Sequence, residues 1–255
     1  MLTHTYIHIP GIGARTEQRF WGAGLLTWEH FLTHPDRSPL NGARRETALE
    51  FIRSSRQHLR RGSPDFFKPL MPSSEAWRFY EAFRENCAFV DIETTGLGSA
   101  VDHLTVVGVY DGSRTFSFIH GRNLDELPAV LQRYPLLITF NGATFDMPFI
   151  RRFFPRLPSG QLHLDLRYPL QRLGYRGGLK AIERKLGVGR DSALDGLDGW
   201  DAVRLWHRYC RGDNASLDTL VAYNRSDIEN LQPLADFACG TLKKQLLMTV
   251  ADRSP

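Results

Sequence analysis

The sequence predicts an α/β protein in which a mixed β-sheet is flanked by helices and preceded by a small, mainly helical N-terminal module. Three observations predict this fold class. Three strand-like segments follow one another after residue 86, a fourth strand follows a helix, and the last third of the chain is largely helical. Consecutive strands followed by alternating helix and strand are typical of mixed sheets. We therefore expect a module over residues 1–85 and an α/β domain over residues 86–245.

The N-terminal module contains two helical patterns, at 44–59 (RRETALEFIRSSRQHL) and 74–85 (SEAWRFYEAFRE), joined by a connector rich in proline, glycine and serine. Before them, residues 9–32 (IPGIGARTEQRFWGAGLLTWEHFL) place two glycine turns ahead of two short helices. This segment resembles the helix-hairpin-helix module, in which small residues let backbone amides at a helix start approach a phosphate. A turn that only packs the module is the alternative interpretation.

The elements of the α/β domain follow from alternation and periodicity. A glycine turn in YDGSR separates the second and third strands. Strands are expected at 87–93, 103–110, 114–120 and 136–140, and helices near 124–134, directly after 141–146, and over 217–240.

Composition limits the classes of function. The chain has 255 residues, 42% hydrophobic and 24% charged, which is typical of a soluble globular protein with a substantial core. No apolar run approaches the roughly 20 residues of a membrane-spanning helix, so we expect a cytoplasmic protein without membrane contact. The net charge of +4 mildly favours a polyanionic partner. The arginines of RSSRQHLRRG also fit a solvated helix face.

Acidic residues stand at positions that favour metal chemistry. Asp91 and Glu93 alternate on a strand, so both carboxylates leave the same face. Two carboxylates this close repel each other unless they share a cation, and Mg²⁺ prefers such oxygen ligands. Asp146 starts a helix after the fourth strand, and Tyr223 and Asp227 lie one helical turn apart. A lone Asp-x-Glu pair would equally fit two solvent-facing acids.

Taken together, three motifs carry a family resemblance. DIETTGL, NGATFD and YNRSD occur in this order on an expected strand, helix and helix. The sequence over residues 86–240 resembles the DEDD, or DnaQ-like, exonucleases of the ribonuclease-H-like superfamily. It is most similar to the YprB-like branch with a tyrosine in the third motif. The resemblance implies a ribonuclease-H-like sheet flanked by helices, and its four acids and tyrosine are all present.

The resemblance also implies roles for individual residues. It implies two divalent cations, Mg²⁺ or Mn²⁺, held by Asp91, Glu93, Asp146 and Asp227, with Asp91 shared between the two sites. Tyr223 would orient the attacking water. The residues expected to contact the 3′-terminal nucleotide are Thr94, Thr95, Gly96, Leu97, Asn141 and Phe145, although each could instead shape a turn or fill the core.

Three further groups of residues are open to two interpretations. His163 has no second histidine at a ligand spacing, so we expect a structural histidine. Asp165 could lie near the acids, but a structural hydrogen bond is the preferred interpretation. Basic residues on a short helical pattern could follow a nucleic-acid backbone or face solvent: Lys180, Arg184 and Lys185.

We therefore expect a metal-dependent 3′–5′ exonuclease that acts on single-stranded DNA or RNA 3′ ends. Two alternatives remain open: a nucleic-acid-binding or scaffold module that kept the fold, and a structure-specific endonuclease with the same chemistry. The sequence does not distinguish a DNA from an RNA substrate, because two-metal chemistry acts on both.

Overall fold

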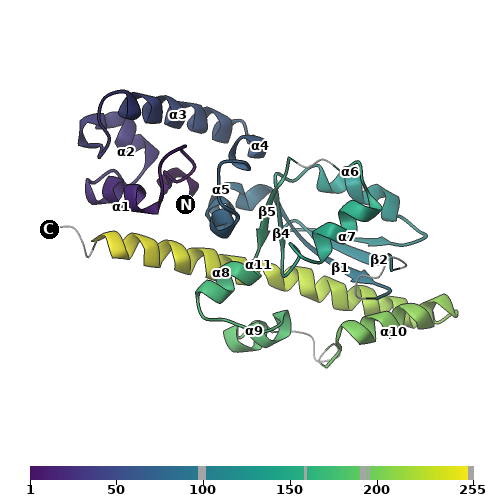
Figure 1. Cartoon of the computed structure of the whole chain (residues 1–255). Helices are drawn as coiled ribbons and strands as arrows, with labels where there is room; N and C mark the ends of the chain where they lie inside the picture. Colours follow the sequence, from purple (N-terminus) through teal and green to yellow (C-terminus); the bar gives the residue numbers. More distant parts are fainter. Residues whose placement is uncertain (97–101, 158–159, 190–193, 195, 252–255) are drawn as a thin grey trace.

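The computed structural model describes residues 1–96, 102–157, 160–189, 194 and 196–251. Its centre is a five-stranded mixed sheet with the strand order β3-β2-β1-β4-β5, which confirms the expected fold class (Figure 1). β1 pairs antiparallel with β2 and parallel with β4, while β2–β3 is antiparallel and β4–β5 is parallel. The strands are β1 (Cys87–Thr94), β2 (Leu104–Tyr110), β3 (Thr115–Ile119), β4 (Leu136–Thr139) and β5 (Leu162–Asp165).

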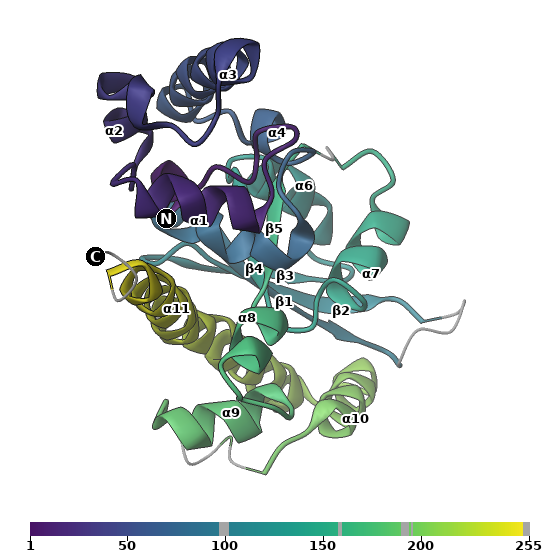
Figure 2. The ribbon, with the colours of Figure 1, turned by 60° about the vertical axis from the view of Figure 1, so that its left-hand side comes forward.

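Helices cover both faces of the sheet (Figures 1 and 2). In the described part of this domain they are α6 (Leu127–Leu131), α7 (Asp146–Phe153), α8 (Arg167–Arg172), α9 (Leu179–Leu186), α10 (Gly199–Cys210) and α11 (Asn214–Ala251). The helix expected over 124–134 is split into a 3-10 turn at Leu124–Glu126 and α6. Within the described ranges, no helix has both the length and the apolar character that a bilayer crossing requires.

The alternation of β1 separates its two faces. Ala88, Val90 and Ile92 pack in a cluster with residues of α6 and α7. Phe89, on the opposite face, packs in a core with the apolar side of α11. Asp91 and Glu93 follow Phe89 at steps of two and therefore lie on the α11 face. The strand thus directs its two carboxylates toward the longest helix of the domain.

The N-terminal part consists of short helices and the longer α3, which lies at the outer edge of the molecule, and it packs against the α/β domain (Figure 2). Its elements are η1 (Leu2–His4), α1 (Ala14–Gly22), α2 (Trp28–Thr33), η2 (Pro35–Arg37), α3 (Gly42–Arg60), α4 (Pro64–Phe67), η3 (Ser73–Phe79), α5 (Tyr80–Phe83) and η4 (Arg84–Asn86). The helical pattern expected over 74–85 is divided in the structure into two 3-10 helices, η3 and η4, on either side of the short α-helix α5. The residues from Ala76 to Tyr80 are all buried, which a regular one-sided helix does not achieve.

The N-terminal part and the sheet share one hydrophobic core. Leu2, Tyr6 and Trp21 belong to the same buried cluster as Leu164 of β5 and Leu242 of α11. The N-terminal helices are therefore packed onto the domain rather than tethered to it by a linker alone.

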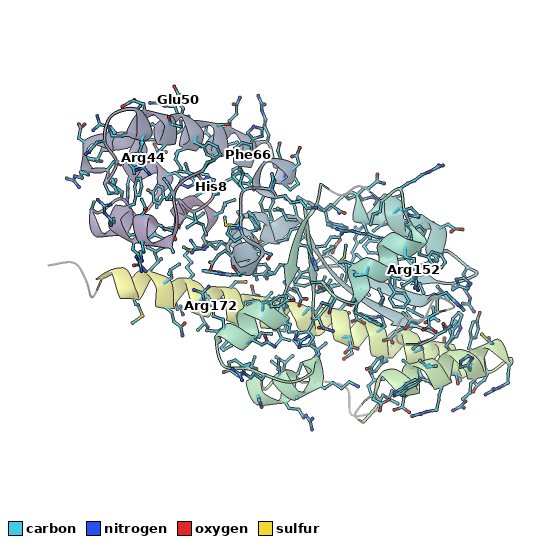
Figure 3. All side chains as sticks on the ribbon, viewed as in Figure 1. His8, Arg44, Glu50, Phe66, Arg152 and Arg172 are labelled. Carbon is cyan, nitrogen blue, oxygen red and sulfur yellow. The ribbon has the colours of Figure 1, made fainter. Side chains whose placement is uncertain are left out.

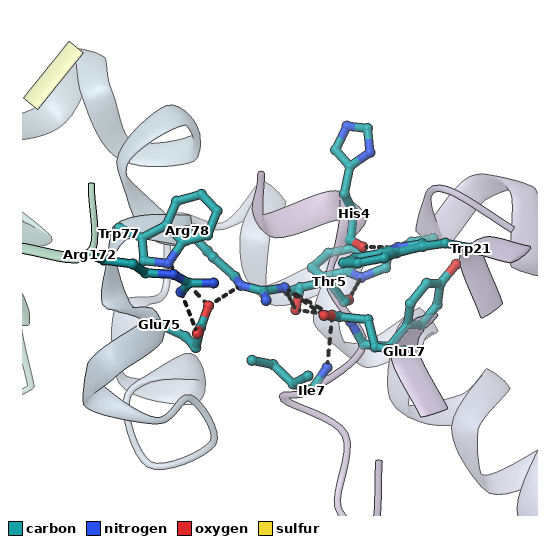
Figure 4. Close-up of polar contacts among 11 residues, drawn as sticks. His4, Thr5, Ile7, Glu17, Trp21, Glu75, Trp77, Arg78 and Arg172 are labelled. Atoms are coloured by element: carbon teal, nitrogen blue, oxygen red, sulfur yellow. Dashed lines mark hydrogen bonds and ion pairs between the residues drawn. The ribbon is translucent and has the colours of Figure 1, made fainter. Parts of the chain in front are cut away.

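A buried polar network reinforces this contact (Figure 4). Arg78 of η3 donates to both carboxylate oxygens of Glu17 in α1, at 3.0 and 2.9 Å, and Thr5 donates to Glu17 at 2.6 Å. Arg78 also donates to Glu75 at 2.7 Å, and Glu75 accepts a bond at 2.9 Å from Arg172 of α8, labelled in Figure 3. The chain of bonds joins α1 to α8 through η3.

Removing a charge from this network should destabilise the fold far more than removing one from an exposed ion pair. We expect Arg78→Met to lower the free energy of unfolding by about 3–5 kcal/mol, because the buried carboxylate of Glu17 loses its counter-charge. Arg204→Met is the matched control, since Arg204 pairs with Asp201 on the exposed side of α10, and we expect a loss below about 1 kcal/mol. Urea unfolding measures both; equal losses would contradict the role given to the network.

Candidate active site

Two segments that are far apart in the sequence bring three carboxylates together on the α11 face of β1. Asp91 and Glu93 come from β1, and Asp227 comes from the middle of α11. One carboxylate oxygen of each of these three residues lies within 4.8 Å of the others. Asp146, the first residue of α7, lies close enough for its charge to raise the pKa of both Asp91 and Glu93. The four acids therefore form one electrostatic group.

The acids are largely withdrawn from water. Glu93, Asp146 and Asp227 are each less than a tenth exposed, and Asp91 is half-buried. Burial raises the pKa of Asp91 and Glu93 well above the usual values, and the charge of Asp227 raises them further. Burial also raises the pKa of Asp146 to about 7, assisted by Asp165. In the absence of a cation, burial and mutual repulsion therefore favour the protonated form of Asp91, Glu93 and Asp146.

The donor set is suited to a hard divalent cation. It offers only carboxylate oxygens, which Mg²⁺ and Mn²⁺ prefer over nitrogen or sulfur. In the described part of the chain, Oδ1 of Asp146 is buried and has no hydrogen-bond partner. A shared cation would compensate the repulsion among the acids and give that oxygen a partner.

Tyr223 lies one turn before Asp227 on α11 and is 6% exposed. Its ring packs in a cluster with Val106 of β2 and Trp206 of α10. The ammonium of Lys180, from the first turn of α9, lies 4.4 Å from the centroid of the same ring. The ring of Tyr223 is therefore contacted by apolar side chains and by the cation of Lys180, which lies over its face.

Asn224 is a site residue that the sequence analysis missed. It is fully buried, and its amide nitrogen donates to the backbone oxygen of Asp91 at 3.2 Å and to Oδ2 of Asp91 at 2.9 Å. The space for this side chain comes from Gly108 of β2, where a Cβ atom would lie 2.1 Å from Oδ1 of Asn224. A glycine inside an apolar strand is a sequence signal for such a close approach.

The loop of the second motif is fixed by Asp165. This carboxylate accepts hydrogen bonds from the backbone N–H of Asn141 at 2.7 Å, Ala143 at 3.0 Å and Arg167 at 3.0 Å. Asn141 has a φ of 64°, in the left-handed region that asparagine tolerates better than most residues. The expectation of a structural hydrogen bond for Asp165 is confirmed.

The side chains of this loop are also engaged with protein neighbours. Asn141 accepts a bond from Arg167, and the ring of Phe145 lies 5.1 Å from that of Phe149. His163 bonds through Nε2 to Thr139 at 2.9 Å, which confirms a structural histidine. Substrate contacts for Asn141 and Phe145 stay predictions.

The turn of the first motif closes on itself. Thr94 donates to the carbonyl oxygen of Gly96, and Thr95 accepts through its hydroxyl from the backbone N–H of His103 at 3.1 Å. At Gly96 a Cβ atom would lie 2.4 Å from the carboxylate of Asp102, so a larger residue there would displace that side chain. Leu97 falls outside the described residues. The substrate contacts expected of this turn stay predictions.

The α/β domain matches a known protein family. A family model described as the RNase_H superfamily matches residues 88–239, the segment that contains the sheet, the four acids and Tyr223. The chain belongs to the RNase H superfamily. Residues 1–87 of this RNase H superfamily protein lie outside the match. No curated protein matches its sequence.

Several solved structures are similar to the chain. The family B DNA polymerase of the archaeon Pyrobaculum calidifontis is 18% identical over 59% of this chain and 24% of the polymerase, with a TM-score of 0.48. NrnC of Brucella melitensis with bound Mg²⁺ is 21% identical over 68% of this chain and 84% of NrnC, with a TM-score of 0.44. RNase D of Escherichia coli, an exoribonuclease, is 17% identical over 69% of this chain and 48% of RNase D, with a TM-score of 0.42. The chain thus spans about a quarter of the polymerase and half of RNase D.

Because the pKa of Asp146 is raised in the folded protein, the stability of the fold should depend on pH. Its carboxyl titrates near 7 in the folded protein and near 4 when unfolded, so folding binds a proton between these values. The contribution to stability is therefore full below about pH 4 and is lost as the pH rises to about 7. We expect Asp146→Asn, in chelator, to raise the melting temperature at pH 8 by at least about 3 °C. The gain should shrink steadily toward pH 4 in thermal scans; a gain that does not vary with pH would exclude the carboxylate charge as its cause.

Gly108 provides a second test of the site's construction. We expect Gly108→Ala to lower the free energy of unfolding by about 1–3 kcal/mol, because the new methyl group displaces Asn224 from Asp91. Gly240→Ala in α11 is the control, since a Cβ atom there meets nothing within 4 Å, and alanine favours the helix. Urea unfolding compares the two; a neutral Gly108→Ala would show that Asn224 is not tightly placed.

Proposed function

We propose that this RNase H superfamily protein is a metal-dependent 3′–5′ exonuclease of the DEDD type, in the YprB-like branch with a tyrosine in the third motif. The observation that carries the proposal is the convergence of its three motifs. Asp91, Glu93 and Asp227 share a 4.8 Å neighbourhood, Asp146 joins them electrostatically, and Tyr223 stands one turn from Asp227. A fold that served only as a scaffold would gain nothing from the cost of burying four acids together.

In this proposal Asp91, Glu93 and Asp227 hold one divalent cation, and Asp91 and Asp146 help to hold a second. The cations, Mg²⁺ or Mn²⁺, supply charge stabilisation for an in-line displacement at phosphorus. Asn224 keeps one oxygen of Asp91 in place through its bond at 2.9 Å. The burial of the acids excludes bulk water and strengthens each electrostatic contact.

Tyr223 has the role of orienting the attacking water. A phenol with an ordinary pKa near 10 is a poor base at neutral pH, but its hydroxyl can accept and donate hydrogen bonds. The packing of the ring against Val106 and Trp206 limits the directions in which that hydroxyl can point. Orientation rather than proton abstraction is therefore the function that this environment supports.

The proposed substrate is a single-stranded 3′ end of DNA or RNA. The turn of Thr94, Thr95 and Gly96, with the following Leu97, would receive the terminal nucleotide. Asn141 and Phe145 would contact the terminal sugar or stack near it. We propose residues 86–245 as the catalytic domain and residues 1–85 as a mainly helical N-terminal module, packed on that domain, whose segment 9–32 contributes to nucleic-acid binding.

The first experiment incubates 5′-labelled single-stranded DNA and RNA of one sequence with the full chain in Mg²⁺, Mn²⁺ or chelator. We expect shortening from the 3′ end that requires the cation. Asp91→Ala should reduce the rate to below about 0.1% of wild type, because it removes several kcal/mol of charge stabilisation. Asp218→Asn, an exposed acid on α11, is the control and should leave the rate unchanged.

Other outcomes decide between the alternative functions. Cleavage of a circular single strand by the wild type would indicate an endonuclease. Tight binding of both strands without cleavage, in either cation, would overturn the exonuclease proposal and favour a binding module. Shortening that persists in Asp91→Ala would exclude this acid from the chemistry.

A further inference from the structure

Two contacts fix α9 on α11. The side-chain amide of Asn230 donates to the buried carboxylate of Glu183 at 3.1 Å and to the carbonyl oxygen of Gly189 at 3.3 Å. Ile182, the neighbour of Glu183, is buried in the main hydrophobic core. A helix anchored through adjacent polar and apolar residues cannot rotate about its axis without losing one contact. Figure 2 shows α9 on the α11 side of the sheet.

This anchoring determines where Lys180 points. Lys180 and Glu183 are three residues apart and lie on the same side of α9, while Tyr223 and Asn230 are seven apart and share a side of α11. When Glu183 meets Asn230, Lys180 consequently meets Tyr223. The ammonium nitrogen lies 4.4 Å from the ring centroid and is shielded from solvent.

The positive charge of Lys180 also acts on the acid cluster. This charge lowers the pKa of Glu93, against the effects of burial and of the other acids, which raise it. Basic residues later in α9 are exposed instead, including Lys185, which contacts the backbone oxygen of Arg176 at 3.4 Å. Within the described part of α9, Lys180 is thus the cation that faces the site.

We propose that Lys180 is a positioning residue of this active site, which holds the ring of Tyr223 and, through this contact, brings a positive charge to the edge of the acid cluster. The inference rests on the proposed function and extends it to a residue outside the three motifs. A cation on the face of a tyrosine is attracted by the ring, and the attraction is strongest when both groups are removed from water. Holding the ring on two sides restricts the direction of its hydroxyl, which is the property that orienting a water requires.

The two roles predict opposite effects of removing the charge. Without Lys180 the hydroxyl of Tyr223 loses its fixed direction, so turnover falls. The acid cluster, by contrast, becomes more negative and attracts a divalent cation more strongly. A lysine that only supports the fold would weaken turnover and cation binding together.

The test compares Lys180→Met, Lys180→Arg and the control Lys244→Met, which removes the same charge from an exposed position of α11. We expect Lys180→Met to lower kcat by about 10- to 100-fold with little change in KM, because orientation rather than substrate binding is lost. Lys180→Arg should recover most of kcat, and Lys244→Met should match wild type. Calorimetric titration with Mn²⁺ alone should show about 3- to 10-fold tighter binding to Lys180→Met.

The outcomes separate this inference from the proposed function. An unchanged kcat in Lys180→Met beside an active wild type overturns the role of Lys180 and leaves the nuclease intact. If Lys180→Met binds Mn²⁺ no more tightly than the wild type, the role of Lys180 is also overturned, because its charge then has no effect on cation binding. If the wild type cleaves nothing, the proposed function fails, and the Mn²⁺ titration still tests the charge effect. If Lys180→Met does not fold by circular dichroism, Lys180→Gln replaces it in both measurements.

Discussion

Mutual repulsion among buried carboxylates is the constraint on which this structure depends. Four acids that would separate in water are held near one another by a strand, a helix start and the middle of a long helix. Two of the acids are positioned by neighbours that cannot easily move: Asn224 holds Asp91, and the sheet holds Glu93. Proteins that concentrate like charges in this way sacrifice stability for function, and the surrounding packing must supply the difference.

The surrounding packing is extensive, and part of it comes from outside the RNase H superfamily match. Residues of the N-terminal helices share one core with β5 and the C-terminal half of α11. The Glu17–Arg78–Glu75–Arg172 network joins α1 to α8 through charge-assisted bonds. The N-terminal helices are thereby packed against the C-terminal half of α11, which limits the freedom of this helix to tilt away from β1.

Much of the site was predictable from the sequence because it depends on local periodicity. The strand period placed Asp91 and Glu93 on one face, and the helical turn placed Tyr223 beside Asp227. Asp165 was correctly expected to make a structural bond. Asn224 was missed because its role depends on Gly108 of a different strand, and the orientation of Lys180 depends on the contact between Glu183 and Asn230. β5 was missed because four residues contain too little alternation to indicate a strand.

The position of α11 in the chain has a consequence for the order of folding during synthesis. Asp227 lies on the last element described, so the other three acids are synthesised well before it. The early chain therefore meets less like-charge repulsion than the finished protein does. The same helix also contributes Leu242 to the cluster that contains Leu2, so the N-terminal core is completed only after α11 has been synthesised. Contacts of such long sequence separation form late and slowly, which places the assembly of the charged centre near the end of folding.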